Sequence, residues 1–121
     1  MSSEVAQELF EACETGKGNE GCSKYLVDGA TFSCQSDALK DVKTMAEYCD
    51  WMKGACEKMP ECSYKLIAKG KSGNKFMFYA QFFMSPSAPP SDYVYVMDIN
   101  DEGKCSGMVK IWNSTWAFGP H

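Results

Sequence analysis

Residues 93–112 read Tyr-Val-Tyr-Val-Met-Asp-Ile-Asn-Asp-Glu-Gly-Lys-Cys-Ser-Gly-Met-Val-Lys-Ile-Trp, and the architecture can be worked out from them. Two runs rich in β-branched and aromatic residues flank Asn100-Asp101-Glu102-Gly103, a polar segment with a glycine that is typical of a hairpin turn. We therefore expect two antiparallel strands, over residues 93–100 and 104–116.

The stretch before this hairpin predicts two more strands. Residues 63–69 and 75–84 are rich in strand-forming side chains, and the segment 70–74 between them contains two glycines. The next segment, 85–91, has too many prolines for a strand and reads as an exposed loop.

The first half of the chain has helical periodicity. An amphipathic helix is expected from Ser3 to Glu14, followed by a second short helix that starts at Cys22 and ends near Gly29, and by a brief strand over residues 30–34. The longest helix is expected to begin at Ser36 or Asp37. Its apolar stripe, which we interpret as core, consists of Val42, Met45, Cys49, Met52, Cys56 and Met59, and Pro60 ends it.

Helices followed by an antiparallel meander indicate an α+β fold in which helices cover one face of a curved sheet. The 121 residues fit a single domain, 1–121. Residues 76–84 are apolar on both sides of their strand, and a second apolar set falls on the face away from the helices, at Val94, Val96, Val109 and Ile111. Because a monomer rarely exposes so large an apolar surface, we predict that this convex face is buried in a symmetric homodimer.

Composition excludes several functions. The net charge is −4 and no basic run occurs, which argues against a nucleic-acid partner. No apolar run approaches the roughly 18 residues of a membrane span, and the N-terminus lacks a secretion signal, so a cytoplasmic protein is expected. The seven cysteines are odd in number and lack paired zinc-site spacing, so we expect reduced thiols, no metal and no cofactor.

Four segments are similar to SnoaL-like proteins: residues 16–22, 28–35, 48–54 and 108–113. The order of the predicted elements also resembles the nuclear transport factor 2-like superfamily. The resemblance implies a cone-shaped fold with a pocket for a small, largely apolar molecule. It leaves the chemistry open, because that superfamily includes isomerases, dehydratases, cyclases, hydrolases and pure binding modules. Asn19 departs from the pattern, since similar proteins usually carry tryptophan there.

Ketosteroid isomerase, in the same superfamily, is similar enough to compare residue by residue. Its catalytic tyrosine falls on Phe10, its proton-transferring aspartate on Cys34 and its oxyanion-stabilising acid on Tyr95. Phe10 cannot donate a hydrogen bond, so that isomerisation mechanism is not expected here. Tyr95 can still act as a donor, and Cys34 as a weak base or nucleophile.

The last hairpin suggests which side chains line the pocket. If Asn100 faces Gly103, then Tyr93 lies opposite Lys110, and Tyr95 opposite Met108, on one face. The comparison makes this face concave. The expected ligand-binding residues are Phe10, Tyr25, Trp51, Tyr79, Tyr93, Met97, Met108 and Trp112.

Lys110 is the most informative residue in this set. An ammonium that points into an aromatic cavity must be paired, hydrated near the mouth, or lowered in pKa. It could instead extend to the pocket rim or pair with an acid such as Asp50. Asp50 itself, next to the apolar stripe, could reach either the cavity or solvent.

Our leading hypothesis from the sequence is a small-molecule enzyme in which Lys110, Asp50 and a tyrosine perform acid–base chemistry on a carbonyl or polyketide-like substrate. Cys34 is a further catalytic candidate, although the sequence offers no histidine partner other than the terminal His121. The alternatives are a non-catalytic binding or dimerisation module for a small apolar ligand, and a protein-interaction scaffold.

Overall fold

The computed structural model describes residues 2–112, which form three helices, a 3-10 turn and a five-stranded sheet. The predicted α+β class is confirmed. The helical elements are α1 (Ser2–Glu14), α2 (Gly18–Cys22), η1 (Ser23–Tyr25) and α3 (Met45–Lys58). The strands are β1 (Leu26–Cys34), β2 (Ser63–Ser72), β3 (Lys75–Phe83), β4 (Ser91–Ile99) and β5 (Cys105–Trp112).

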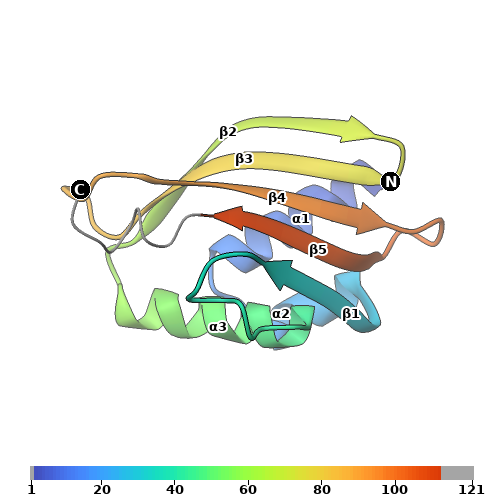
Figure 1. Cartoon of the computed structure of the whole chain (residues 1–121), viewed down its shortest axis with the longest axis horizontal. Coiled ribbons are helices and arrows are strands. Elements are labelled where there is room, and N and C mark those ends of the chain that lie inside the picture. The colour runs from blue at the N-terminus through green and yellow to red at the C-terminus, as the bar shows by residue number, and fades with distance from the viewer. Residues whose placement is uncertain (1, 113–121) are drawn as a thin grey trace.

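The strands form one open sheet in the order β1-β5-β4-β3-β2. All neighbouring pairs are antiparallel except β1 and β5, which are parallel. Figure 1 shows α1, α2 and α3 gathered on one side of the sheet, with α3 near the β1 edge. The inner face of the sheet is therefore covered by helices, as the sequence predicted.

Helix α3 begins later than predicted. Its N-cap is Thr44, whose hydroxyl accepts a hydrogen bond from the Glu47 amide at 3.2 Å, while the Glu47 carboxylate accepts one from the Thr44 amide at 3.1 Å. This reciprocal capping box satisfies two amides that the first turn leaves unpaired. Ser36 and Asp37 instead lie in the turn after β1. The predicted end is confirmed, since α3 stops at Lys58, before Pro60.

Strand β1 begins earlier than predicted. The second helix ends at Cys22, η1 covers three more residues, and the chain is already extended at Leu26. Gly29 adopts a φ of +74°, within the interval where the pairing register with β5 shifts. A glycine tolerates this conformation, which explains how a strand can run through a position that we assigned to a helix end.

The register of the β4–β5 hairpin differs by two residues from the predicted one. Tyr93 pairs with Trp112 and Tyr95 with Lys110, whereas we had placed Tyr93 opposite Lys110. Two features contribute one residue each: the Asn100 amide donates to the Lys104 carbonyl, so Asn100 faces Lys104 instead of Gly103, and the register shifts between Asp98 and Ile99. Because the difference is even, the side chains keep their faces, and the predicted inward set still shares one side of the sheet.

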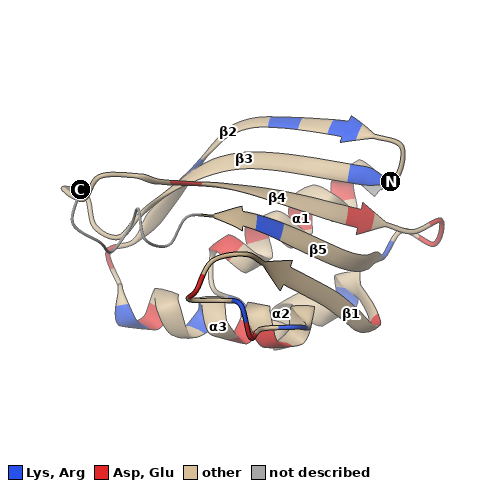
Figure 2. Ribbon diagram, in the orientation of Figure 1, with Lys and Arg blue, Asp and Glu red and all other residues tan. Residues whose placement is uncertain are grey.

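The two faces of the sheet differ in burial. Inward side chains such as Tyr95 and Met97 have no exposed surface, whereas the outer face leaves large apolar side chains exposed: Ile67 (43%), Tyr79 (37%), Val109 (43%) and Ile111 (51%). Figure 2 shows few charged residues across the middle of β4 and β5, where the single basic residue within β5 is Lys110.

Within residues 2–112, no helix is long and apolar enough to cross a membrane. The end of the predicted last strand, residues 113–116, and the terminal His121 lie outside the described residues.

Candidate functional site

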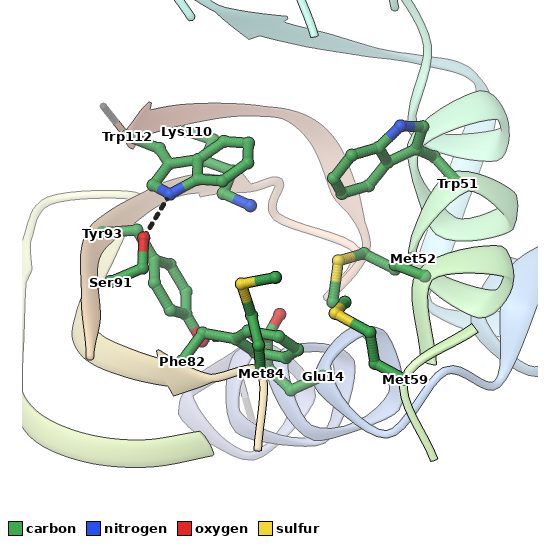
Figure 3. Close-up of a pocket in the computed structure, with 11 residues that line it drawn as sticks. Glu14, Trp51, Met52, Met59, Phe82, Met84, Ser91, Tyr93, Lys110 and Trp112 are labelled. Atoms are coloured by element: carbon green, nitrogen blue, oxygen red, sulfur yellow. Dashed lines mark hydrogen bonds between the residues drawn. The ribbon is translucent and has the colours of Figure 1, made fainter. Parts of the chain in front are cut away.

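A pocket of about 50 Å³ lies between α3 and the inner face of the sheet (Figure 3). We call it the α3 pocket. Its polar side chains come from α1, β4 and β5, and its apolar walls come from α3, from the end of β3, from the residues just after these two elements, and from Trp112 of β5. The lining residues are Glu14, Trp51, Met52, Ala55, Met59, Phe82, Met84, Ser91, Tyr93, Lys110 and Trp112.

Lys110 points into the protein and is only 5% exposed. Its ammonium donates a hydrogen bond to the Tyr48 hydroxyl at 3.0 Å and lies 4.3 Å from the centroid of the Trp112 ring. Four further rings have centroids within 5.7 Å of the same nitrogen: Tyr48, Trp51, Tyr93 and Tyr95. Burial lowers the pKa of this ammonium to about 8, although the nearby Glu14 carboxylate opposes the shift.

Glu14 is the last residue of α1, and its carboxylate interacts electrostatically with the Lys110 ammonium. It was not among the predicted site residues. It is 4% exposed, and its two carboxylate oxygens accept hydrogen bonds from Tyr93 and Tyr95. Burial raises the pKa of the Glu14 carboxyl, while the Lys110 charge and the two phenols act in the opposite direction. Burial therefore moves the pKa values of this acid and this amine toward each other.

A continuous line of hydrogen bonds joins the two charged groups through the core. Tyr95 donates to Glu14, so the hydroxyl of Tyr48 must donate to the oxygen of Tyr95. The oxygen of Tyr48 is then free to accept from Lys110. We call Lys110, Tyr48, Tyr95, Glu14 and Tyr93 the buried polar network.

The phenols of this network are proton donors across the ordinary pH range. Burial raises the pKa of Tyr48, of Tyr95 and of Tyr93, and the negative charge of Glu14 raises each further. Within residues 2–112, every buried side-chain nitrogen or oxygen has a hydrogen-bond partner. The network can thus hold a proton at either end, on the amine or on the carboxyl group, without leaving a polar group unpaired.

The structure brings together five of the predicted site residues. Lys110, Tyr93, Trp51 and Trp112 line the α3 pocket, and Tyr95 lies behind it in the network. Figure 3 shows the Lys110 amine between the indole rings of Trp51 and Trp112.

Three predicted ligand-binding residues pack in the core and do not line this pocket. Phe10 stacks on Phe78, with ring centroids 4.9 Å apart. Met97 and Met108 pair with each other across β4 and β5 and are at most 3% exposed. These three side chains belong to the hydrophobic core.

Four predicted site residues lie elsewhere. Asp50 is exposed on α3, where its carboxylate accepts a hydrogen bond from the Asn19 amide at 2.8 Å, so of the two alternatives it reaches solvent and does not line the cavity with Lys110. Tyr79 lies on the outer face and donates to Asp92, which corrects its assignment to the pocket. Tyr25 in η1 borders a separate surface groove. Cys34 is half-buried and pairs with Lys110 across β1 and β5, but does not line the pocket.

A signal for the two missed residues was present in the sequence. Glu14 follows Phe10 by four residues, and Tyr48 lies between Met45 and Met52 at intervals of three and four, so both fall on buried helix faces. Glu14 was considered only as the last residue of the expected first helix. Because an acid is almost never fully buried unless it is paired, an acid on the buried face of an amphipathic helix is the pattern that indicates a site residue.

Three thiols that are far apart in the sequence also meet. Cys13, Cys22 and Cys49 come from α1, α2 and α3, and their sulfur atoms all lie within 4.8 Å of one another. None of them lines the α3 pocket. The spacing of cysteines in the sequence did not indicate this cluster, which is the one group of potential metal ligands among the described residues.

No family model matches the sequence, and no curated protein matches it. Solved structures are similar in fold. One is a nuclear transport factor 2-like protein of unknown function from Cytophaga hutchinsonii, with a TM-score of 0.72 and 14% identity over 98% of this chain and 95% of the other. Another is a candidate isomerase of the SnoaL-like family from Agrobacterium tumefaciens. Its TM-score is 0.68, and it is 16% identical over 91% of this chain and 95% of the other. A third is a candidate polyketide cyclase from Sinorhizobium meliloti. Its TM-score is 0.66, and it is 14% identical over 91% of this chain and 98% of the other.

Proposed function

We propose that this chain, which has the fold of the SnoaL-like and nuclear transport factor 2-like superfamily, is an enzyme that performs acid–base chemistry on a small carbonyl compound in the α3 pocket. The observation that carries the proposal is the placement of Glu14 and Lys110. Both line the same pocket, and hydrogen bonds through Tyr48 and Tyr95 connect them. An apolar pocket with a few converging titratable groups is the usual form of a small-molecule site.

In this proposal the two charged groups have different roles. The Lys110 ammonium donates a hydrogen bond to the carbonyl oxygen of the substrate and stabilises the negative charge that develops there. The Glu14 carboxylate removes the proton from the adjacent carbon, and burial makes it a stronger base than an exposed glutamate. Tyr93 and Tyr95 hold the carboxylate in place through one hydrogen bond to each oxygen.

The pocket volume limits the substrate. At about 50 Å³, the cavity is far below the roughly 300 Å³ at which pockets for drug-sized ligands begin. Three of its walls are thioethers, Met52, Met59 and Met84, which are flexible and can repack. We therefore propose a carbonyl substrate with few non-hydrogen atoms, and a larger polyketide-like one only if these methionines move aside.

The names of the two structural neighbours are consistent with this chemistry. One is a candidate isomerase and the other a candidate polyketide cyclase, and acid–base chemistry next to a carbonyl group is compatible with both names. Here the reaction is proposed from the side chains of the α3 pocket.

The test is proton exchange beside a carbonyl group. A panel of small ketones and β-diketones is incubated with the protein in deuterated buffer, and loss of the α-proton signal is followed by NMR. The wild-type protein should accelerate exchange for at least one compound. Glu14→Gln should reduce that rate by about a hundredfold or more, the usual contribution of a general base.

Asp50→Asn is the matched control, because it also removes a carboxylate from this part of the chain but lies outside the pocket. It should exchange protons at the wild-type rate. Exchange that proceeds equally in Glu14→Gln and wild type, or no acceleration for any compound in the panel, would rule out the catalytic proposal.

The second candidate is a binding module that holds a small apolar ligand without transforming it. It is favoured by the complete pairing of the buried polar network, in which Lys110 is surrounded by five rings. In that case Lys110→Met should leave ligand-dependent thermal stabilisation intact, because only apolar walls are needed. In an enzyme the same variant loses turnover.

We further propose that the outer face of the sheet is buried in a homodimer. Register places apolar side chains of three strands side by side on this face: Met77 with Val96 and Val109, and Tyr79 with Val94 and Ile111. Charged side chains border the patch, with Asp92 at one end and the Lys75–Asp98 ion pair at the other. An apolar centre with a polar rim is the composition of a protein interface.

Light scattering coupled to size-exclusion chromatography tests this second proposal. Wild type should have the mass of two chains, and Ile111→Lys, which places a charge within the patch, should have the mass of one. Glu57→Lys, on the exposed side of α3, should stay dimeric. A monomeric wild type would contradict the proposal.

A further inference from the structure

We propose that Cys13, Cys22 and Cys49 form a binding site for a soft, thiophilic metal ion, and that the ion is Cu(I). The proposal is independent of the chemistry in the α3 pocket. It starts from geometry, because three sulfur atoms from three different helices converge to within 4.8 Å of one another.

The local structure that brings the sulfurs together is a tight turn. Gly16 and Gly18 adopt φ values of +71° and +72°, which allows the chain to reverse after α1 and lay α2 against α3. The approach is close: a Cβ on Gly16 would lie 2.8 Å from the Cβ of Cys56. This turn places Cys22, the last residue of α2, beside Cys13 and Cys49.

The spacing of the sulfurs fits an ion between them. With a metal–sulfur distance of about 2.3 Å, three sulfurs around a trigonal ion lie about 4 Å apart. The sulfurs of Cys13 and Cys49 are already 3.8 Å apart. The third sulfur, of Cys22, must move by no more than about 1 Å to complete the triangle.

The type and number of the available ligands indicate which ion the site binds. Thiolate sulfur prefers soft ions, of which Cu(I) and zinc are the common ones in proteins. Zinc takes four ligands, and the described residues offer no fourth His, Cys, Asp or Glu in the cluster. The three cysteines are at most 1% exposed, so solvent does not reach them to supply a ligand either. Cu(I), which is satisfied by two or three sulfurs, fits this closed site.

Binding changes protonation but not oxidation state. Thiol protons leave to solvent as copper–sulfur bonds form, and Cu(I) enters and remains as Cu(I). Three helices become joined at one point, including the five-residue α2, which on its own is too short to be a stable helix. The bound ion should therefore raise the thermal stability of the protein.

The experiment is an anaerobic titration of the reduced protein with Cu(I) in competition with bicinchoninate. Wild type should retain one Cu(I) per chain against the competitor, and Cys22→Ser should weaken binding by at least about tenfold, since one of three ligands is lost. Cys34→Ser is the control, a half-buried cysteine outside the cluster, and should bind as wild type does. Circular dichroism checks that both variants are folded.

Equal weakening in Cys22→Ser and Cys34→Ser, or no retention by wild type, would overturn the proposal. X-ray absorption of the copper-loaded wild-type protein gives a result that needs no variant: three sulfur neighbours are expected, and two or fewer, or nitrogen and oxygen neighbours, would refute the site. Displacement of the bound Cu(I) by equimolar Zn²⁺ would refute the choice of ion.

Discussion

Raising the pH from about 8 to about 10 should stabilise the folded protein through Lys110. Burial lowers the pKa of its ammonium to about 8, whereas a lysine in an unfolded chain has a pKa of about 10.4. Between these values the unfolded chain keeps a proton that the folded chain has lost, so the free energy of unfolding increases with pH. Below the folded pKa, lysine is protonated in both states and contributes no slope.

The size of the effect follows from the shift. Each pKa unit corresponds to about 1.4 kcal/mol, so two pH units above the folded pKa contribute about 2 to 3 kcal/mol. Other groups act in the opposite direction. Burial raises the pKa of Cys105 to about 11 and also raises that of Tyr95. Such groups ionise first in the unfolded chain, so they lower stability as the pH rises.

A comparison with Lys110→Met separates these contributions. The variant lacks the amine but retains the thiols and phenols, so subtracting its unfolding free energy from that of wild type leaves the lysine contribution. Urea unfolding followed by tryptophan fluorescence, in the presence of a reductant, gives both values at each pH.

The difference between wild type and Lys110→Met should increase by about 2 to 3 kcal/mol from about pH 8 to about pH 10. The same subtraction for Lys53→Met, which removes an exposed lysine of α3, should stay level. A level difference for Lys110→Met as well would refute the argument that burial lowers the pKa of this ammonium.

Three further predictions concern stability, each measured by urea unfolding at neutral pH. Tyr95→Phe should cost about 1 to 3 kcal/mol because it leaves Glu14 with one phenol donor instead of two, and a change below about 0.5 kcal/mol would contradict the hydrogen bond. Thr44→Ala should cost about 0.5 to 2 kcal/mol through loss of the capping box, whereas Thr44→Ser should cost little. Gly107→Ala should cost about 1 to 3 kcal/mol because its Cβ would lie 2.6 Å from Thr31 Oγ1, and adding Thr31→Ala should recover part of that loss if this contact is the cause.

Sequence periodicity predicted the elements well and the helix starts poorly. Pro60 and the apolar stripe gave the end of α3, because a proline beyond the first turn lacks the amide for the helical hydrogen bond and clashes with the preceding turn. The start was placed at Ser36 or Asp37, and Thr44, an equally good cap, was not considered. The glutamate three residues after Thr44 completes a capping box and was the deciding signal.

The site was predicted in part for a similar reason. Strand alternation is a local rule, so it correctly sent Tyr93, Tyr95, Lys110 and Trp112 to one face even though the register was wrong by two. Whether an acid such as Glu14 or Asp50 faces that set depends on how helices pack on the sheet. That packing is a long-range property, and alternation within a strand carries no information about it.

The arrangement of the buried polar network favours a functional explanation over a purely structural one. Burying a carboxylate and an ammonium costs several kcal/mol in lost hydration, and apolar residues of similar volume often stabilise a core as well or better. If the network only filled the core, its charged ends would have no reason to face an open space. Glu14 and Lys110 instead both line the α3 pocket, while the neutral phenols of Tyr48 and Tyr95 lie behind them. A molecule in the pocket would therefore meet both an acid and an amine, connected by hydrogen bonds through the protein, which is the arrangement that the proposed proton transfer requires.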